Sequence, residues 1–180
     1  FFKEISNDII KGLKPITSNM EKRGGGITSM ELIDMNKKIR CYYQIFVKFN
    51  TVDSMGANFI NSCLEKITEI FKFYVEEKKF LDTVSEKIDF VMSILSNYTP
   101  NCVVKAGVDC KIKDLENNGE LNDSKFIENF IRAVKISKVD NFRAVTHNKG
   151  IMNGIDSVVI ATGNDFRSVE AGIHAYASRK

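Results

Sequence analysis

The sequence contains few cysteines, histidines and prolines: four, two and two among 180 residues. None of the cysteines is spaced as CxxC, and two histidines add few ligands, so we expect no metal site. The low cysteine density also argues against a disulfide framework. We therefore expect all the cysteines to be reduced and mostly buried: Cys41, Cys63, Cys102 and Cys110.

Long hydrophobic runs are absent as well. The longest, Phe90–Leu95 and Ile155–Ala161, are far shorter than the roughly 20 residues that span a bilayer. Lys3, Glu4 and Asp8 interrupt any apolar stretch at the N-terminal end, so no signal peptide is predicted. We expect a cytoplasmic protein that does not bind membranes.

Neither charge is in strong excess, since 26 basic and 23 acidic residues give a formal net charge of +3. A nucleic-acid-binding protein usually concentrates more positive charge on one element, so we expect no nucleic-acid partner. Small basic clusters at Lys22–Arg23 and Lys37–Arg40 fit either a solvated face or an edge that docks phosphates. With 43% hydrophobic and 27% charged residues, the chain has a globular composition, which excludes a disordered or fibrous protein.

The first hundred residues predict an α+β lobe with an antiparallel sheet. A helix is predicted over residues 2–13 and is expected to end at Pro15. After Gly24–Gly26, two strands are predicted over residues 27–35 and 40–52, joined by a hairpin turn at 35–38. In the second strand, strict alternation places one set of apolar residues on one face: Cys41, Tyr43, Ile45, Val47 and Phe49. A long amphipathic helix is predicted from Ile60 to Tyr74.

The rest of the chain is predicted to be mostly helical. The expected elements are a short helix over 84–94, a strand over 102–112, a turn at 117–119, a helix over 124–136, and two helices after residue 141 separated by Gly163. We place a soft domain boundary near residue 100, giving domains of residues 1–100 and 101–180.

Three segments could carry chemistry, and the first is Val52–Asn58, VDSMGAN, at the junction of a strand and a helix. A glycine there allows a ligand to approach the backbone, and the helix N-terminus offers unpaired N–H groups that suit a phosphate. The alternative is an ordinary helix start capped by Asp53 or Ser54. The segment is not GxGxxG, so a Rossmann fold is not supported.

The second segment is residues 143–156, RAVTHNKGIMNGID. If it is helical from Lys149, then Lys149, Asn153 and Asp156 share one face and could hold a polar substrate. The alternative is an exposed polar stripe. A lone histidine such as His147 is more often structural than catalytic.

The third segment is residues 161–176, ATGNDFRSVEAGIHAY, in which Asn164 and Asp165 follow Gly163 and precede a helix. One interpretation is a helix N-cap. The other is a carboxylate that reaches Lys149, where a buried Lys–Asp pair would keep the lysine charged and oriented.

Together with SNY at Ser96–Tyr98 and the glycine run at 24–26, these segments resemble the hydroxymethylglutaryl-coenzyme A (HMG-CoA) reductase family, in particular its bacterial class II form. The resemblance implies NAD(P)H-dependent reduction of HMG-CoA to mevalonate and coenzyme A, on the mevalonate route to isoprenoids. It also implies a ferredoxin-like small domain that binds the cofactor, part of a large domain that binds HMG-CoA, and a homodimer with active sites at the subunit interface.

The motifs transfer to this chain residue by residue. Lys149 and Asp165 match the catalytic lysine and aspartate of the family, and Arg143, Asn153 and Asn97 match substrate-binding groups. The residues that match the cofactor motif DAMGxN are Asp53, Ser54, Met55, Gly56, Ala57 and Asn58, with Ser54 in place of alanine.

The resemblance places the catalytic glutamate of the family before residue 1 and the histidine that protonates the CoA thiolate after Lys180, so neither His147 nor His174 inherits that role. We therefore expect a central, inactive fragment of a reductase. The alternative is a non-catalytic module for nucleotide binding and dimerisation. The basic residues ahead of the glycine run favour NADPH over NADH, and Lys14 is the predicted selector.

Overall fold

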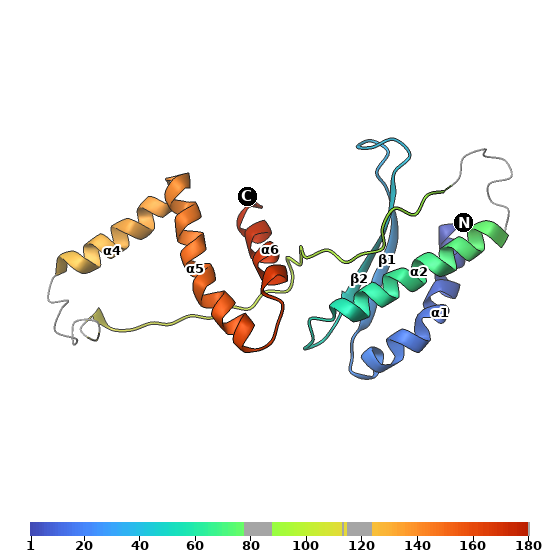
Figure 1. The fold of residues 1–180 in the computed structure, drawn as a ribbon, viewed down its shortest axis with the longest axis horizontal. Coiled ribbons are helices and arrows are strands. Elements are labelled where there is room, and N and C mark those ends of the chain that lie inside the picture. Colours follow the sequence, from blue (N-terminus) through green and yellow to red (C-terminus); the bar gives the residue numbers. More distant parts are fainter. Residues whose placement is uncertain (78–87, 113, 115–123, 180) are drawn as a thin grey trace. The chain divides into compact units, whose positions relative to one another are not determined.

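The structure is a computed structural model that describes residues 1–77, 88–112, 114 and 124–179. The chain divides into two compact units, Phe1–Leu95 and Ser96–Lys180. Figure 1 shows α1, β1, β2 and α2 in the first unit and α4, α5 and α6 in the second. The expected α+β class is confirmed, because helices accompany an antiparallel pair of strands.

The core of the first unit lies between its two helices and one face of its sheet. Strands β1 (Gly26–Asp34) and β2 (Tyr43–Asn50) pair antiparallel, and α1 (Phe2–Lys22) and α2 (Ala57–Glu77) pack against them. The buried helix residues are Ile5, Ile9, Leu13, Cys63, Ile67, Phe71 and Val75. Within each helix these positions recur every four residues, which gives the helix one apolar stripe that is withdrawn from water.

The prediction that Pro15 ends the first helix is wrong, because α1 continues to Lys22 with Pro15 inside it. A proline removes one backbone hydrogen bond and usually breaks a helix. Here the buried face continues beyond it through Thr17 and Met20. Packing of that last turn therefore outweighs the local penalty.

The predicted hairpin is confirmed, with its face assignment correct only in part. Ile45, Val47 and Phe49 of β2 pack against the core. Tyr43 is exposed, and Cys41 lies before the strand with a positive φ of 59°. Cys41 sits in the hairpin turn, where its N–H donates to Asn36 Oδ1 at 2.7 Å, so it cannot continue the alternation.

The predicted helix over 84–94 is wrong where the structure describes it, since residues 88–94 are not helical, and residues 84–87 lie outside the described part. This segment packs instead in an extended form along α2. The Phe90 and Phe71 rings meet edge to face with centroids 5.8 Å apart. Asn61 Oδ1 accepts a hydrogen bond from the Leu95 N–H at 3.0 Å. These contacts outweigh the helical periodicity of the sequence.

The second unit contains α4 (Ser124–Ser137), α5 (Asn141–Ala161) and α6 (Phe166–Ala177). The predicted helices are confirmed, and Gly163 separates α5 from α6 with a left-handed φ of 71°. The predicted strand over 102–112 is wrong, since residues 102–111 form no strand and are exposed. No neighbouring strand pairs with this described segment, and alternation alone does not hold an isolated strand. The predicted turn at 117–119 lies outside the described residues.

The expectation that the cysteines are mostly buried is also wrong. Cys63 is buried in α2, and burial raises the pKa of its thiol to about 11. Cys41, Cys102 and Cys110 are exposed. No helix among the described residues is both long and apolar enough to cross a membrane.

Candidate active site

The loop between β2 and α2 is a tight turn held by its own side chains. Thr51 Oγ1 donates to the Ser54 carbonyl at 2.7 Å, and Ser54 Oγ donates back to the Thr51 carbonyl at 2.8 Å. Gly56 has a φ of 72°, and a Cβ atom there would collide with the Thr51 side chain. A glycine is therefore required at this position, immediately before the first residue of α2.

Asp53 in this loop forms an ion pair with Arg23, the residue that follows α1. The Arg23 guanidinium donates to Asp53 Oδ1 at 2.5 Å. This hydrogen bond lowers the pKa of the Asp53 carboxyl below its usual value. Neither Asp53 nor Ser54 serves as the helix cap that the sequence suggested, because Asp53 binds Arg23 and Ser54 closes the turn.

Helix α5 carries the lysine and asparagine that the sequence singled out. It begins at Asn141, where the sequence predicted a helix, and Asp140 caps it by accepting from the Phe142 N–H at 2.9 Å. The helix is continuous through Lys149, Asn153 and Asp156, so these three residues share one face as predicted. Of the three, Asp156 has a buried carboxylate oxygen, Oδ1.

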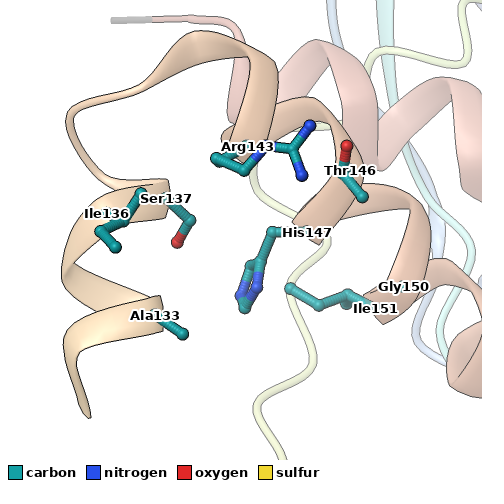
Figure 2. A pocket seen from close by; sticks show the side chains of 8 residues that line it. All are labelled: Ala133, Ile136, Ser137, Arg143, Thr146, His147, Gly150 and Ile151. Atoms are coloured by element: carbon teal, nitrogen blue, oxygen red, sulfur yellow. The ribbon is translucent and has the colours of Figure 1, made fainter. Parts of the chain in front are cut away.

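Arg143 lies on a different face of α5, in a cleft of about 560 Å³ between α4 and α5. Six helix positions separate it from Lys149, which places the two about 120° apart around the helix axis. Figure 2 shows the His147 ring between the two helices, with Ser137 opposite it on α4. Within the second unit, therefore, Arg143 and Lys149 do not converge.

Asp165 is the N-cap of α6, as one of its two interpretations predicted. Its Oδ1 accepts from the Arg167 and Ser168 N–H groups at 3.1 and 3.3 Å, and its Oδ2 accepts from Ser168 Oγ at 3.0 Å. The Ser168 hydroxyl, the Ser168 and Arg167 amides and the Arg167 charge lower the pKa of the Asp165 carboxyl. Among the described ion pairs, Asp165 meets Arg167 at 3.9 Å and none joins it to Lys149.

Asn97 lies beside α6 in the second unit. Its backbone carbonyl is so close to Gly172 that a Cβ atom there would lie 3.1 Å from the oxygen. The Tyr98 N–H donates to Ser96 Oγ at 3.1 Å, which holds the SNY segment in a local turn. A small residue at 172 thus allows this segment to approach the helix.

Sequence reasoning missed two features of the site. The Arg23–Asp53 pair joins residues thirty positions apart, and its one sequence signal was the basic cluster before the glycine run. Nothing in the sequence predicted that one carboxylate oxygen of Asp156 is buried, although the helical spacing did place Asp156 on the same face as Lys149. Both features depend on tertiary packing, which periodicity does not specify.

The first unit pairs its strands antiparallel, which separates this fold from the parallel Rossmann dehydrogenases. The chain belongs to the hydroxymethylglutaryl-coenzyme A reductase family, because the sequence model of that family matches residues 2–180. The resemblance on which the site residues were chosen is therefore confirmed at the level of the family.

Two curated relatives match nearly the whole chain. The 3-hydroxy-3-methylglutaryl-coenzyme A reductase of Archaeoglobus fulgidus is 32% identical over 176 residues, 96% of this chain and 36% of the relative. The "Probable 3-hydroxy-3-methylglutaryl-coenzyme A reductase" of Borreliella burgdorferi is 34% identical over 179 residues, 99% of this chain and 38% of the relative. The chain thus spans little more than a third of the length of these relatives.

Solved structures agree with this assignment. The class II reductase of Streptococcus pneumoniae bound to NADPH in open conformations has a TM-score of 0.65 and 27% identity, over 99% of this chain and 45% of that one. Another structure of a reductase from the same organism has a TM-score of 0.64 and 28% identity, over 96% and 43% of the two chains. The expected likeness to the class II form is therefore supported by structure.

Proposed function

We propose that the protein to which these residues belong reduces HMG-CoA to mevalonate and coenzyme A with NADPH. The observation that carries this proposal is the family match over residues 2–180, which includes every segment singled out from the sequence. The relatives carry the name of this reductase. We place cofactor binding in residues 1–100 and HMG-CoA binding in residues 101–180, within a cytoplasmic homodimer.

The chemistry assigned to Lys149 follows from the charge that develops on the substrate. Reduction of a thioester places negative charge on the carbonyl oxygen. A positioned ammonium group stabilises that oxygen and then supplies a proton to it. Asp165 keeps Lys149 charged and oriented when the two meet, and Asn153 binds the substrate hydroxyl. The guanidinium of Arg143 suits a two-point grip on the free carboxylate of HMG-CoA.

The β2–α2 loop fits a dinucleotide. Gly56 immediately precedes α2, and the unpaired N–H groups of the first turn of that helix can bind a phosphate. Residues Asp53–Asn58 would hold the nucleotide, which when bound supplies the reducing equivalents. The Arg23 guanidinium, paired with Asp53 at the edge of this loop, offers a cation for the 2′-phosphate that distinguishes NADPH from NADH.

Two cations compete for the role of selector, and their contacts differ. Lys14, predicted from the sequence, pairs with Glu21 on its own helix at 2.6 Å. Arg23 pairs with the cofactor loop itself. We therefore assign the selection of NADPH to Arg23 in preference to Lys14.

Arg23→Ala is expected to raise KM for NADPH by about 10-fold or more, because a charge-assisted contact is lost and Asp53 is left uncompensated beside the phosphate. The KM for NADH, which lacks the 2′-phosphate, should change much less. Steady-state kinetics with both nucleotides measures this difference, with Lys14→Glu as the matched control. A shifted preference in Lys14→Glu and an unchanged one in Arg23→Ala would reverse the assignment.

The proposed function is tested by assaying NADPH oxidation with and without HMG-CoA, using the longest natural polypeptide that contains residues 1–180. We expect oxidation that requires HMG-CoA and yields mevalonate and free CoA thiol. Residues 1–180 alone are expected to be inactive, since they match only part of each relative. An intact protein that binds NADPH without HMG-CoA-dependent oxidation would favour the non-catalytic nucleotide-binding module.

A further inference from the structure

Val52, in the β2–α2 loop, has a backbone conformation that its residue type disfavours. Its φ is 57°, in the left-handed region, where a β-branched residue is an outlier. The Val52 side chain is 49% exposed, so core packing does not impose this conformation. Strained backbone of this kind persists only where neighbouring contacts fix it, and it clusters at ligand-binding sites. The contact that holds Val52 therefore bears on the function of the loop.

Asn50, the last residue of β2, supplies that contact. Its side-chain Oδ1 accepts a hydrogen bond from the Val52 N–H at 2.9 Å. A bond from an asparagine side chain to the backbone two residues later fixes a turn. The backbone of Asn50 pairs with Gly26 of β1 in the sheet. Asn50 is thus anchored to the sheet and holds the start of the loop.

The turn that follows α1 approaches the Asn50 backbone closely. A Cβ atom at Gly25 would lie 2.5 Å from the Asn50 carbonyl oxygen, so only glycine allows this approach. Arg23 stands two residues before Gly25, and Asp53 comes directly after Val52. Asn50 therefore lies where the two segments that form the Arg23–Asp53 ion pair meet.

The same arrangement occurs at the other end of the hairpin. Among the described residues, Cys41 and Val52 are the non-glycine residues with a positive φ. The Cys41 N–H donates to Asn36 Oδ1 at 2.7 Å, as the Val52 N–H donates to Asn50 Oδ1. Each left-handed residue is thus held by an asparagine side chain, but Cys41 lies in the β1–β2 turn, outside the cofactor motif.

We propose that Asn50 is a positioning residue for the binding of NADPH. Its bond to Val52 turns the chain so that Asp53 reaches Arg23. The ion pair in turn places the Arg23 guanidinium for the 2′-phosphate of the nucleotide. Without the bond, Val52 relaxes toward the conformations that its side chain favours, and the ion pair loses its fixed geometry. The inference rests on the proposed function, in which residues 53–58 hold NADPH and Arg23 binds the 2′-phosphate.

Fluorescence titration of the longest natural polypeptide that contains residues 1–180 with each nucleotide tests this role. Asn50→Ala is expected to raise the Kd for NADPH by about 5-fold, the effect of losing one hydrogen bond of ordinary net strength. The Kd for NADH, which lacks the 2′-phosphate, should change much less. In an Arg23→Ala background, Asn50→Ala should no longer change the ratio of the two Kd values, because the group that it positions is absent.

Two further variants separate positioning from a general loss of structure. Asn36→Ala is the matched control, because it removes the same kind of bond from Cys41 and should leave both Kd values unchanged. Val52→Gly is a suppressor, since glycine adopts a positive φ freely. In that background, Asn50→Ala should raise the Kd for NADPH much less. If Asn50→Ala weakens NADPH and NADH equally, or if Asn36→Ala has the same effect, the proposal is overturned.

Amide hydrogen exchange tests the hydrogen bond apart from nucleotide binding. The Val52 N–H should exchange slowly in the wild type and rapidly in Asn50→Ala, whereas the Cys41 N–H should exchange equally in both. Rapid exchange of the Val52 N–H in the wild type would overturn the proposal even if NADPH binds normally. A wild type that protects the Val52 N–H but binds no NADPH would contradict the proposed function and, with it, the role assigned to Asn50.

Discussion

Lys149→Ala is expected to lower HMG-CoA-dependent oxidation of NADPH by about 10²- to 10³-fold, the usual cost of removing one donor that stabilises an oxyanion. The ammonium group is the proposed partner of the charge that develops on the thioester oxygen, and alanine offers nothing in its place. Because the Lys149 side chain is exposed on α5, its removal should leave the fold intact. The loss should therefore fall on kcat, with the thermal unfolding temperature unchanged.

The matched control for this prediction is Lys138→Ala. Lys138 is an exposed lysine of the same unit, in the turn between α4 and α5. It removes the same charge without touching the proposed site, so its activity should match the wild type. Steady-state kinetics and thermal unfolding of the wild type, Lys149→Ala and Lys138→Ala measure the changes in kcat and in unfolding temperature. Comparable activity in Lys149→Ala and wild type would remove Lys149 from the mechanism.

Asp165→Asn is expected to lower kcat by about 10²-fold or more while preserving α6. The substitution distinguishes two roles of the Asp165 side chain, as a helix cap and as a charged partner of Lys149. As the N-cap, Asp165 accepts hydrogen bonds from backbone amides, and asparagine caps a helix equally well. As the proposed partner of Lys149, it must carry a negative charge, which asparagine lacks. A charged partner of this kind sustains the ammonium form of a lysine.

Asp140→Asn is the matched control, since Asp140 caps α5 as Asp165 caps α6. Both variants should keep their helices in circular dichroism spectra, and only Asp165→Asn should lose activity. If the two variants lose activity equally, or if neither does, Asp165 is a cap alone.

The Asp165 carboxyl is also expected to make the free energy of unfolding depend on pH, with lower stability at acid pH. The pKa of the folded Asp165 carboxyl is lowered by its bonds to Ser168 and Arg167. The Asp165 carboxylate therefore contributes its full share to the free energy of unfolding above the pKa that this carboxyl has in the unfolded chain. That share is lost as the pH falls through the lower pKa of the folded protein. Asp165→Asn should remove this acid-side loss, as measured by chemical unfolding across the acidic range. An identical pH profile in wild type and variant would contradict the assignment.

The helical spacing of apolar residues predicted a helix correctly wherever that helix buries one face within its own unit. The apolar spacing of Ile5, Ile9 and Leu13 in α1, and of Ile67 and Phe71 in α2, reports burial directly, and a helix forms over each predicted segment. The local signals were equally good at helix ends. A glycine with positive φ at 163 and an aspartate at 165 break one helix and cap the next, through contacts within three residues.

Prediction failed where distant contacts decide the structure. Pro15 should end a helix on local grounds, and the packing of Thr17 and Met20 carries α1 past it. Residues 88–94 have helical spacing, and contacts with α2 hold them extended. Polar and apolar residues alternate over 102–111, which predicts a strand. A strand needs a neighbouring strand to pair with, and no described strand pairs with this segment.

The sequence alone determined the family, the order of the main elements and the residues for the proposed chemistry, because motif identity and short-range spacing are written in consecutive residues. Tertiary structure alone decided which of these residues meet. It paired Arg23 with Asp53 and buried one oxygen of Asp156. Such pairings depend on how helices and loops pack across long stretches of chain, and no local pattern encodes that geometry.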